Sequence, residues 1–88
     1  KKDDIDKYLN NIKFDVIIDD GSHELQDQLN AFHLLWSKLN LGGYYVIEDI
    51  YDIDKSREYF LALSKNVLIV DLRYLKNKYN DVLVIIQK

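Results

Sequence analysis

The sequence predicts an α/β fold, namely the rear half of a doubly wound, largely parallel sheet that ends in an antiparallel hairpin. Three observations predict this class. Short β-branched segments alternate with segments whose apolar residues recur at helical spacing. The last two strand-like segments have no helical segment between them, which favours an antiparallel pair. Acidic residues follow each of the first two strand-like segments, where such sheets bind ligands.

The first half of the chain is predicted to contain a helix end, a strand and a long helix. Residues 1–13 are mostly polar, with an apolar spacing that suits the end of a helix. Residues 14–19 (FDVIID) are predicted to form a buried strand, because they are few, β-branched and followed by polar residues. Residues 24–40 are predicted to be helical, with a stripe of Leu25, Leu29, Phe32, Trp36 and Leu39. The capping signals of this helix are Ser22 at its start and Asn40 and Gly42 near its end.

The second half is predicted to contain three strands and a shorter helix. Residues 44–47 (YYVI) form a second buried strand that is again followed by acids. Residues 54–65 are predicted to be an amphipathic helix whose inward side chains are Tyr59, Phe60 and Leu63. Residues 67–72 and 82–86 are predicted to be the two strands of the terminal hairpin.

Composition narrows the possible functions. The chain has 88 residues, and its net charge of −3 argues against nucleic acid as a partner. It has no Cys, which excludes disulfides and thiolate metal sites, and it has no run of apolar residues long enough to span a membrane. Because the chain also has no Met, we expect residues 1–88 to be a single partial domain, a fragment of a longer protein.

Two groups of polar residues are predicted to meet at one edge of the sheet. Asp19, Asp20 and Gly21 follow the first strand, and Glu48 and Asp49 follow the second. Carboxylates that crowd together are costly unless a cation or a shared proton relieves them. With no Cys in the chain, oxygen ligands favour Mg²⁺, Mn²⁺ or Ca²⁺. Adjacent strand residues face opposite sides, so Asp19 and Asp20 are not both expected to reach one ion, and alternation does not choose between them.

His23 follows Asp20 by three residues and is suited to act as a general base beside such an ion. Each of these residues also has a simpler structural interpretation. Either aspartate could favour a helix N-terminus, and His23 alone is more often a solvated or capping residue. His33 is expected on the surface or in packing, and Trp36 in the core. The joint pattern, more than any single residue, indicates a site.

The segment FDVIIDDGSH, a following helix with Gln26 and Phe32, and the segment LGGYYVIEDI resemble metal-dependent O-methyltransferases that use S-adenosylmethionine. The pattern is most similar to the macrolide-sugar O-methyltransferases and the family related to cephalosporin hydroxylase. The catechol-type enzymes share the layout of ligands. The resemblance covers residues 14–50 and implies a Rossmann-like methyltransferase sheet, of which this chain is the C-terminal half.

The resemblance also implies roles for individual residues. It makes Asp20, Glu48 and Asp49 the ligands of Mg²⁺ or Mn²⁺, which would orient two oxygens of the acceptor. It selects Asp20 over Asp19, because the general base of this family lies three residues after the metal aspartate, and His23 has that position. The implied acceptor is the hydroxyl group of a sugar or a similar small molecule.

The resemblance implies that the loop after the first strand forms the adenine-side rim of the cofactor site, with Asp19, Gly21 and Ser22 as the contacting residues. The glycine-rich turn that holds most of the cofactor in this family is absent from the chain. We therefore expect the 88 residues alone to be inactive. A cytoplasmic location, no membrane contact and a possible homo-oligomer complete these expectations.

Two other functions fit parts of the pattern. The chain could be a non-catalytic α/β remnant that serves as an interaction or dimerisation module, because an exposed sheet edge is a template for association. A phosphotransfer receiver also clusters acids at strand ends. It is disfavoured, because its sheet continues with parallel strands and needs a lysine after a later strand, a position that neither Lys55 nor Lys65 fits.

Overall fold

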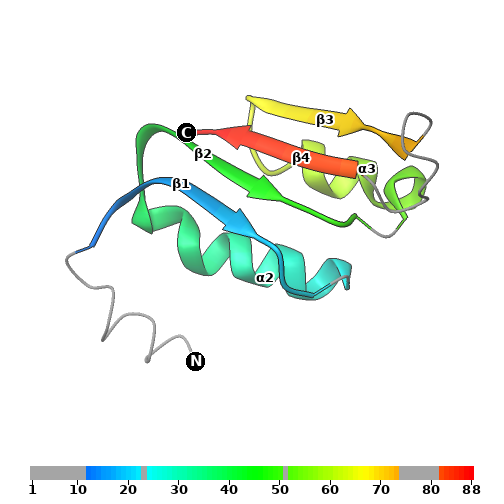
Figure 1. Cartoon of the computed structure of the whole chain (residues 1–88), viewed down its shortest axis with the longest axis horizontal. Helices are drawn as coiled ribbons and strands as arrows, with labels where there is room; N and C mark the ends of the chain where they lie inside the picture. Colours follow the sequence, from blue (N-terminus) through cyan, green and yellow to red (C-terminus); the bar gives the residue numbers. More distant parts are fainter. Residues whose placement is uncertain (1–11, 23, 51, 74–81) are drawn as a thin grey trace.

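The computed structural model describes residues 12–22, 24–50, 52–73 and 82–88. The predicted helix end within residues 1–13 therefore lies almost wholly outside the described residues. The elements are, in order, β1 (Phe14–Asp19), α2 (Leu25–Leu35), a 3₁₀ turn (Trp36–Lys38), β2 (Leu39–Ile47), α3 (Ile53–Leu61), β3 (Val67–Asp71) and β4 (Val82–Gln87). Figure 1 shows the strands as one sheet with the helices alongside it.

The sheet is mixed, with the strand order β1-β2-β4-β3. The strands β1 and β2 are parallel neighbours, and β3 and β4 form the predicted antiparallel hairpin. The position of β4 was not predicted: it lies between β2 and β3 and runs antiparallel to both. The connection through α3 brings β3 parallel to β2 but one strand away, and β4 fills the gap, so that both strands gain a hydrogen-bonding partner.

Both helices cover the same face of the sheet. The connections from β1 through α2 to β2 and from β2 through α3 to β3 move across the sheet in the same direction. Because both connections are right-handed, they place both helices on the same face of the sheet. The shared core contains Phe32 of α2, Phe60 of α3, and inward residues of the two central strands, namely Tyr45, Ile47, Val82, Val84 and Ile86. In a doubly wound sheet, helices cover both faces. In the described part of this chain, α2 and α3 cover a single face of the sheet.

The opposite face of the sheet is apolar, and we call it the open face. Register places nine residues on it: Val16, Ile18, Tyr44, Val46, Leu68, Val70, Leu83, Ile85 and Gln87. In β1, Val16 is 52% exposed and Ile18 is 60% exposed. The prediction that residues 14–19 form a buried strand was therefore wrong, because β1 lies at the edge of the sheet and its residues are half-buried or exposed.

The predicted apolar stripe of α2 is confirmed, but the helix is shorter than expected. Phe32 and Leu39 are buried, and Leu25, Leu29 and Trp36 pack against the core. The chain leaves the helix at Leu35, and β2 begins already at Leu39, where the sequence predicted a helix end. Asn40 is therefore a strand residue, and its side-chain amide donates a hydrogen bond to Asp15 Oδ1 (2.9 Å).

Two further local predictions needed correction. Ser22 is not the N-cap of α2: Glu24 has that position and makes no side-chain capping bond. The helix α3 ends at Leu61 and not at residue 65, and Tyr59 is 58% exposed although an inward orientation was predicted. Phe60, the residue after it, is fully buried and supplies the contact of α3 with the core.

No helix in the described part of the chain is long and apolar enough to cross a membrane.

Candidate functional site

The acidic ends of β1 and β2 lie next to each other, as the sequence predicted. The parallel ladder pairs Asp19 with Ile47, and it continues beyond the strands through a hydrogen bond from the Glu48 backbone N–H to the Asp19 carbonyl (3.0 Å). This bond fixes the point at which the two loops leave the sheet. The loop that begins at Asp20 and the one that begins at Glu48 therefore start side by side.

The electrostatics of these loops reflect the crowding of their carboxylates. Partial burial raises the pKa of Glu48, and the negative charges of Asp20 and Asp49 raise it further. A side-chain hydrogen bond between Glu48 and Asp20 also raises this pKa, because it favours the protonated acid. The structure thus places the Asp20 and Asp49 carboxylates close enough to Glu48 to act on it by charge. A bound cation would relieve this repulsion.

The three predicted metal ligands do not form a closed cluster. Within the described residues, no group of three His, Cys, Asp or Glu side chains could hold a metal ion together. Asp49 has a left-handed backbone with φ of 56°, a conformation that aspartate adopts more readily than most residues other than glycine. Carboxylate oxygens are ligands that magnesium prefers, but the described part of the chain does not assemble three of them around one point. The predicted base, His23, lies outside the described residues.

The predicted cofactor-binding loop is held by its own hydrogen bonds. The Gly21 backbone N–H donates to Asp19 Oδ1 (3.2 Å), a side-chain-to-backbone turn that aspartate commonly makes. The Ser22 hydroxyl accepts a bond from the Glu24 backbone (3.0 Å) and donates one to Asp27 Oδ2 (2.8 Å). These contacts set the path of the loop from β1 into α2. These bonds do not involve a cofactor, so the binding of a cofactor by Asp19, Gly21 and Ser22 stays a prediction.

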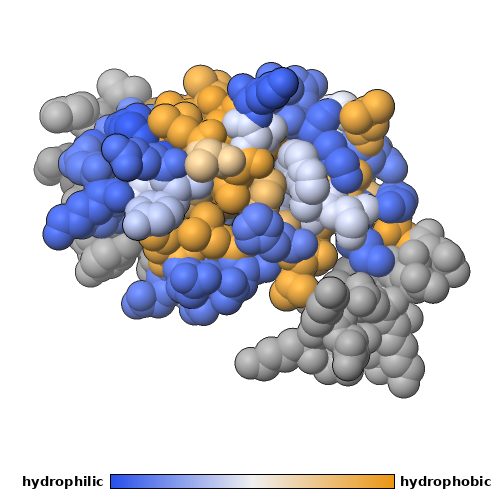
Figure 2. Space-filling view, turned by 180° about the vertical axis from the view of Figure 1, so that it is seen from behind, coloured by the Kyte–Doolittle hydropathy of each residue, from blue (hydrophilic) through white to orange (hydrophobic). Residues whose placement is uncertain are grey.

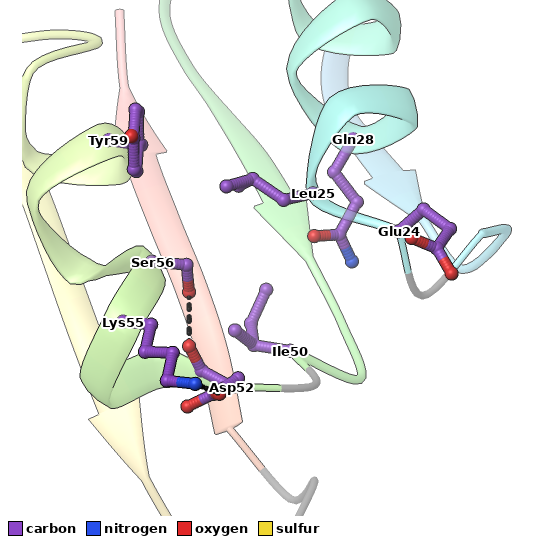
Figure 3. Close-up of a pocket in the computed structure, with 8 residues that line it drawn as sticks. All are labelled: Glu24, Leu25, Gln28, Ile50, Asp52, Lys55, Ser56 and Tyr59. Carbon is purple, nitrogen blue, oxygen red and sulfur yellow. Dashed lines mark hydrogen bonds and ion pairs between the residues drawn. The ribbon is translucent and has the colours of Figure 1, made fainter.

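The structure also contains a hollow that sequence reasoning missed, between α2, α3 and the loop after β2. Its volume is about 390 Å³, and residues of all three segments line it (Figure 3). Gln28 is 2% exposed and lines this hollow, while its amide nitrogen donates to the Ser22 carbonyl (3.1 Å). A signal was present in the sequence: Gln28 falls on the apolar stripe of α2, three residues after Leu25.

Figure 2 views the molecule from the side opposite to Figure 1, where α3 lies in front of β3 and β4. Apolar surface gathers in the middle of this face and is bordered by hydrophilic side chains. Among the described helical residues, the large apolar side chains that are exposed are Tyr59 and Leu61 of α3.

Comparison with known proteins relates part of this chain to several O-methyltransferases. The "8-demethyl-8-(2-methoxy-alpha-L-rhamnosyl)-tetracenomycin-C 3'-O-methyltransferase" of Streptomyces olivaceus is 50% identical over 38 residues, which is 43% of this chain and 10% of that protein. The "demethylmacrocin O-methyltransferase" of Streptomyces fradiae is 47% identical over 38 residues, with the same shares. The "L-olivosyl-oleandolide 3-O-methyltransferase" of Streptomyces antibioticus is 50% identical over 38 residues, also with these shares.

These matches support a methyltransferase relationship for a short segment. The matched segment spans about a tenth of the length of these curated relatives. No family model matches the chain. The four-stranded α/β domain is consistent with a piece of a methyltransferase.

Proposed function

We propose that this chain contributes the metal-binding and acceptor-binding edge of an O-methyltransferase that uses S-adenosylmethionine and acts on a sugar hydroxyl. The observation that carries the proposal is the hydrogen bond from the Glu48 backbone N–H to the Asp19 carbonyl, which starts the Asp20 loop and the Glu48 loop side by side at the carboxyl ends of two parallel strands. The names of the relatives support the sugar hydroxyl as the acceptor.

In this proposal, Asp20, Glu48 and Asp49 hold a divalent cation, Mg²⁺ or Mn²⁺. Such an ion supplies Lewis-acid chemistry, since it lowers the pKa of a bound hydroxyl and orients its oxygen. His23 accepts the hydroxyl proton. S-adenosylmethionine, when bound, would supply the methyl group: its carbon would bond to the acceptor oxygen as its bond to the sulfonium sulfur breaks, which would leave S-adenosylhomocysteine as a neutral thioether. The Asp20 loop and the Glu48 loop position these groups, and orientation contributes much of the rate.

The test removes one carboxylate at a time while preserving side-chain shape. Asp20→Asn and Glu48→Gln, made in the full-length native protein, should each lower methyl transfer by about 100-fold or more, because the cation is no longer held in place. Isothermal titration with Mg²⁺ should show the matching loss of binding. Glu58→Gln is the control: it removes a carboxylate from the exposed surface of α3 and should change neither measurement.

Thermal unfolding of the variants separates loss of function from loss of structure. Both substitutions relieve like-charge repulsion, so their melting temperatures should equal or exceed that of the wild type. Methyl transfer that persists at the wild-type rate in Asp20→Asn, or that continues in the presence of a chelator, would contradict the assignment of the ligands.

A second candidate function is supported by the open face. Its nine residues include no charged side chain, so two copies of this chain can approach there without like-charge repulsion despite the net charge of −3. Under this alternative the chain is a non-catalytic module that dimerises through the open face. Analytical ultracentrifugation should then show a dimer that Ile18→Lys dissociates. A monomer at all concentrations would exclude this function.

A further inference from the structure

The buried glutamine of α2 makes a hydrogen bond that reaches beyond its own helix. Gln28 is 2% exposed and lies four residues before Phe32, on the stripe of α2 that faces the core. A buried amide costs stability unless it is hydrogen-bonded. Its nitrogen donates to the Ser22 carbonyl (3.1 Å), six residues back along the chain and ahead of the helix. Gln28, which Figure 3 shows close to the start of α2, therefore connects the core-facing side of this helix to the Asp20 loop.

Ser22 is held by two neighbouring residues of α2. Its hydroxyl donates to Asp27 Oδ2 (2.8 Å), and its carbonyl accepts from Gln28, so consecutive helix residues bind its hydroxyl and its carbonyl. The same hydroxyl accepts a hydrogen bond from the Glu24 backbone N–H (3.0 Å). Together these three bonds fix the point at which the Asp20 loop enters the helix.

The other end of the Asp20 loop is held at the end of β1. The Gly21 backbone N–H donates to Asp19 Oδ1 (3.2 Å), and the Asp19 carbonyl accepts from the Glu48 backbone N–H (3.0 Å). Asp20, the proposed metal ligand, follows Asp19 directly and lies two residues before Ser22. Because a short loop that is fixed at both ends has few conformations left, these bonds determine where the Asp20 carboxylate can lie.

The two bonds from Ser22 to α2 side chains differ in their surroundings. The bond to Asp27 is exposed, so water competes for both of its groups, whereas the bond from Gln28 is partly buried. A hydrogen bond away from water is electrostatically stronger than an exposed one. Gln28 is therefore the main anchor of the loop on the helix, and Asp27 is the weaker one.

We propose that Gln28 is a positioning residue for the proposed reaction: its buried amide holds the Ser22 carbonyl and thereby keeps the Asp20 carboxylate in place at the end of β1. This inference rests on the proposed function and deepens it, because it assigns the orientation of a metal ligand to the core-facing side of α2. Packing alone does not require an amide here, since an apolar side chain of similar size would suit the stripe. A residue that orients a metal ligand typically contributes roughly 10- to 100-fold to metal affinity or activity.

The test uses the full-length native protein and removes the amide at nearly constant side-chain volume. Gln28→Met should lower methyl transfer and weaken Mg²⁺ binding, measured by isothermal titration, by about 10-fold or more each. Its melting temperature should change little, because methionine suits an apolar stripe. In the metal-free protein, the backbone amide NMR signals of Gly21 and Ser22 should shift. Gln26→Met is the matched control: Gln26 is an exposed glutamine of the same helix that donates to the Asn30 side chain (3.0 Å), and its replacement should change none of these measurements.

A double variant shows whether Gln28 acts through Asp20. In Asp20→Asn, which already lacks the carboxylate, the addition of Gln28→Met should cause little further loss of methyl transfer. Losses that multiply would show that the two residues act independently and would overturn the positioning role. Wild-type signals of Gly21 and Ser22 in Gln28→Met would overturn it as well.

These measurements distinguish failure of this inference from failure of the proposed function. If Asp20→Asn loses methyl transfer while Gln28→Met retains it, only the role of Gln28 is overturned. A lower melting temperature of Gln28→Met with unchanged methyl transfer would likewise assign the amide to stability alone. A wild-type protein without methyl transfer, or full transfer by Asp20→Asn, would instead overturn the proposed function and, with it, the positioning role.

Discussion

Tyr45 combines a fully buried ring with a polar atom that has no partner among the described residues. Its ring is fully buried and meets the Phe32 ring edge to face, with 5.1 Å between centroids. Its hydroxyl, however, has no hydrogen-bond partner among the described residues. Burial raises the pKa of this hydroxyl, and the nearby charge of Asp19 raises it further. The ring therefore stabilises the fold, whereas the hydroxyl is an unpaired polar group that costs stability.

Replacing this hydroxyl tests that interpretation. Tyr45→Phe should leave the free energy of unfolding unchanged or raise it by about 1 kcal/mol, because it removes an unpaired polar atom and keeps the ring. Urea denaturation measures the difference, and Tyr59→Phe serves as an exposed tyrosine control that should have no effect. A loss of more than about 1 kcal/mol would mean that the hydroxyl has a partner in solution.

A second residue-scale interaction links Asp71 and Arg73 at the end of β3. The Arg73 Nε donates to Asp71 Oδ1 (2.8 Å), and a second guanidinium nitrogen donates to Asp71 Oδ2, so the pair is bidentate. These hydrogen bonds lower the pKa of Asp71 to about 2 from its usual 3.8. A carboxylate with a lowered folded-state pKa contributes stability above its unfolded pKa and loses that contribution as the pH falls through the folded value.

The lowered pKa of Asp71 determines how the contribution of this residue to stability depends on pH. Asp71→Asn should lower the melting temperature relative to wild type above about pH 4, and the difference should shrink between about pH 4 and pH 2 as the wild-type carboxylate is protonated. The effect should be small, because the pair is partly exposed and solvent screens it. A difference between the two proteins that is as large at pH 2 as at pH 6 would show that the charge of Asp71 contributes nothing.

At the scale of elements, the neighbouring glycines of β2 serve different purposes. Gly42 has a φ of +86°, which side chains other than glycine rarely adopt, but a Cβ there would meet nothing within 4 Å. Gly43 has the opposite requirement: a Cβ would lie 2.6 Å from the Asp15 carbonyl oxygen and 2.9 Å from Leu39 Cδ1. Gly43 thus permits the close approach of β1 and β2 beside the register shift between Phe14 and Val16.

This difference predicts an order of effects on stability. Gly43→Ala should cost about 2 to 3 kcal/mol, because the blocking atom belongs to the backbone and does not move aside easily. Gly42→Ala should cost about 1 kcal/mol, and Gly42→Asn less, since asparagine tolerates the left-handed region. Chemical denaturation of the three variants gives the order. Equal costs for the two alanine variants would contradict the steric role of Gly43.

The elements could be predicted from the sequence more reliably than their boundaries. Periodicity located the four strands and both described helices, because alternation and helical spacing are local properties. It failed at residues 39–43, where glycine and asparagine are typical of a helix end but here belong to a strand. The register shift and the bond from Asn40 to Asp15 stabilise that strand, and both depend on β1, which is distant in the sequence.

The candidate site could be predicted only in part, for a similar reason. The meeting of Asp20 and Glu48 follows from parallel neighbouring strands, which alternation of elements indicates. The hollow beside Ile50 could not be predicted, because it depends on how far apart α2 and α3 lie over the sheet. The position of Gln28 within the apolar stripe of α2 was the available signal, and a search for polar residues on apolar helix faces would have found it.

At the scale of the whole molecule, two features could not be predicted from the sequence pattern: the strand order, and the position of both described helices on the same face of the sheet. A local pattern defines a hairpin, but whether β4 adds outside β3 or between β3 and β2 depends on pairing energies across the sheet. The open face likewise reflects the common direction of both crossovers. The result is a domain whose covered face carries the core and whose other face presents four strands of apolar side chains.

The central place of β4 has a consequence for synthesis in the cell. Tyr45 pairs with Ile86, which leaves the ribosome 41 residues later. At ordinary rates of translation this interval is roughly 2 to 8 s, during which one side of β2 has no partner strand. An apolar strand edge exposed for seconds can pair with another nascent chain. The synthesis of β4 therefore supplies the missing partner of β2 and ends the period in which this strand edge most needs protection by a chaperone.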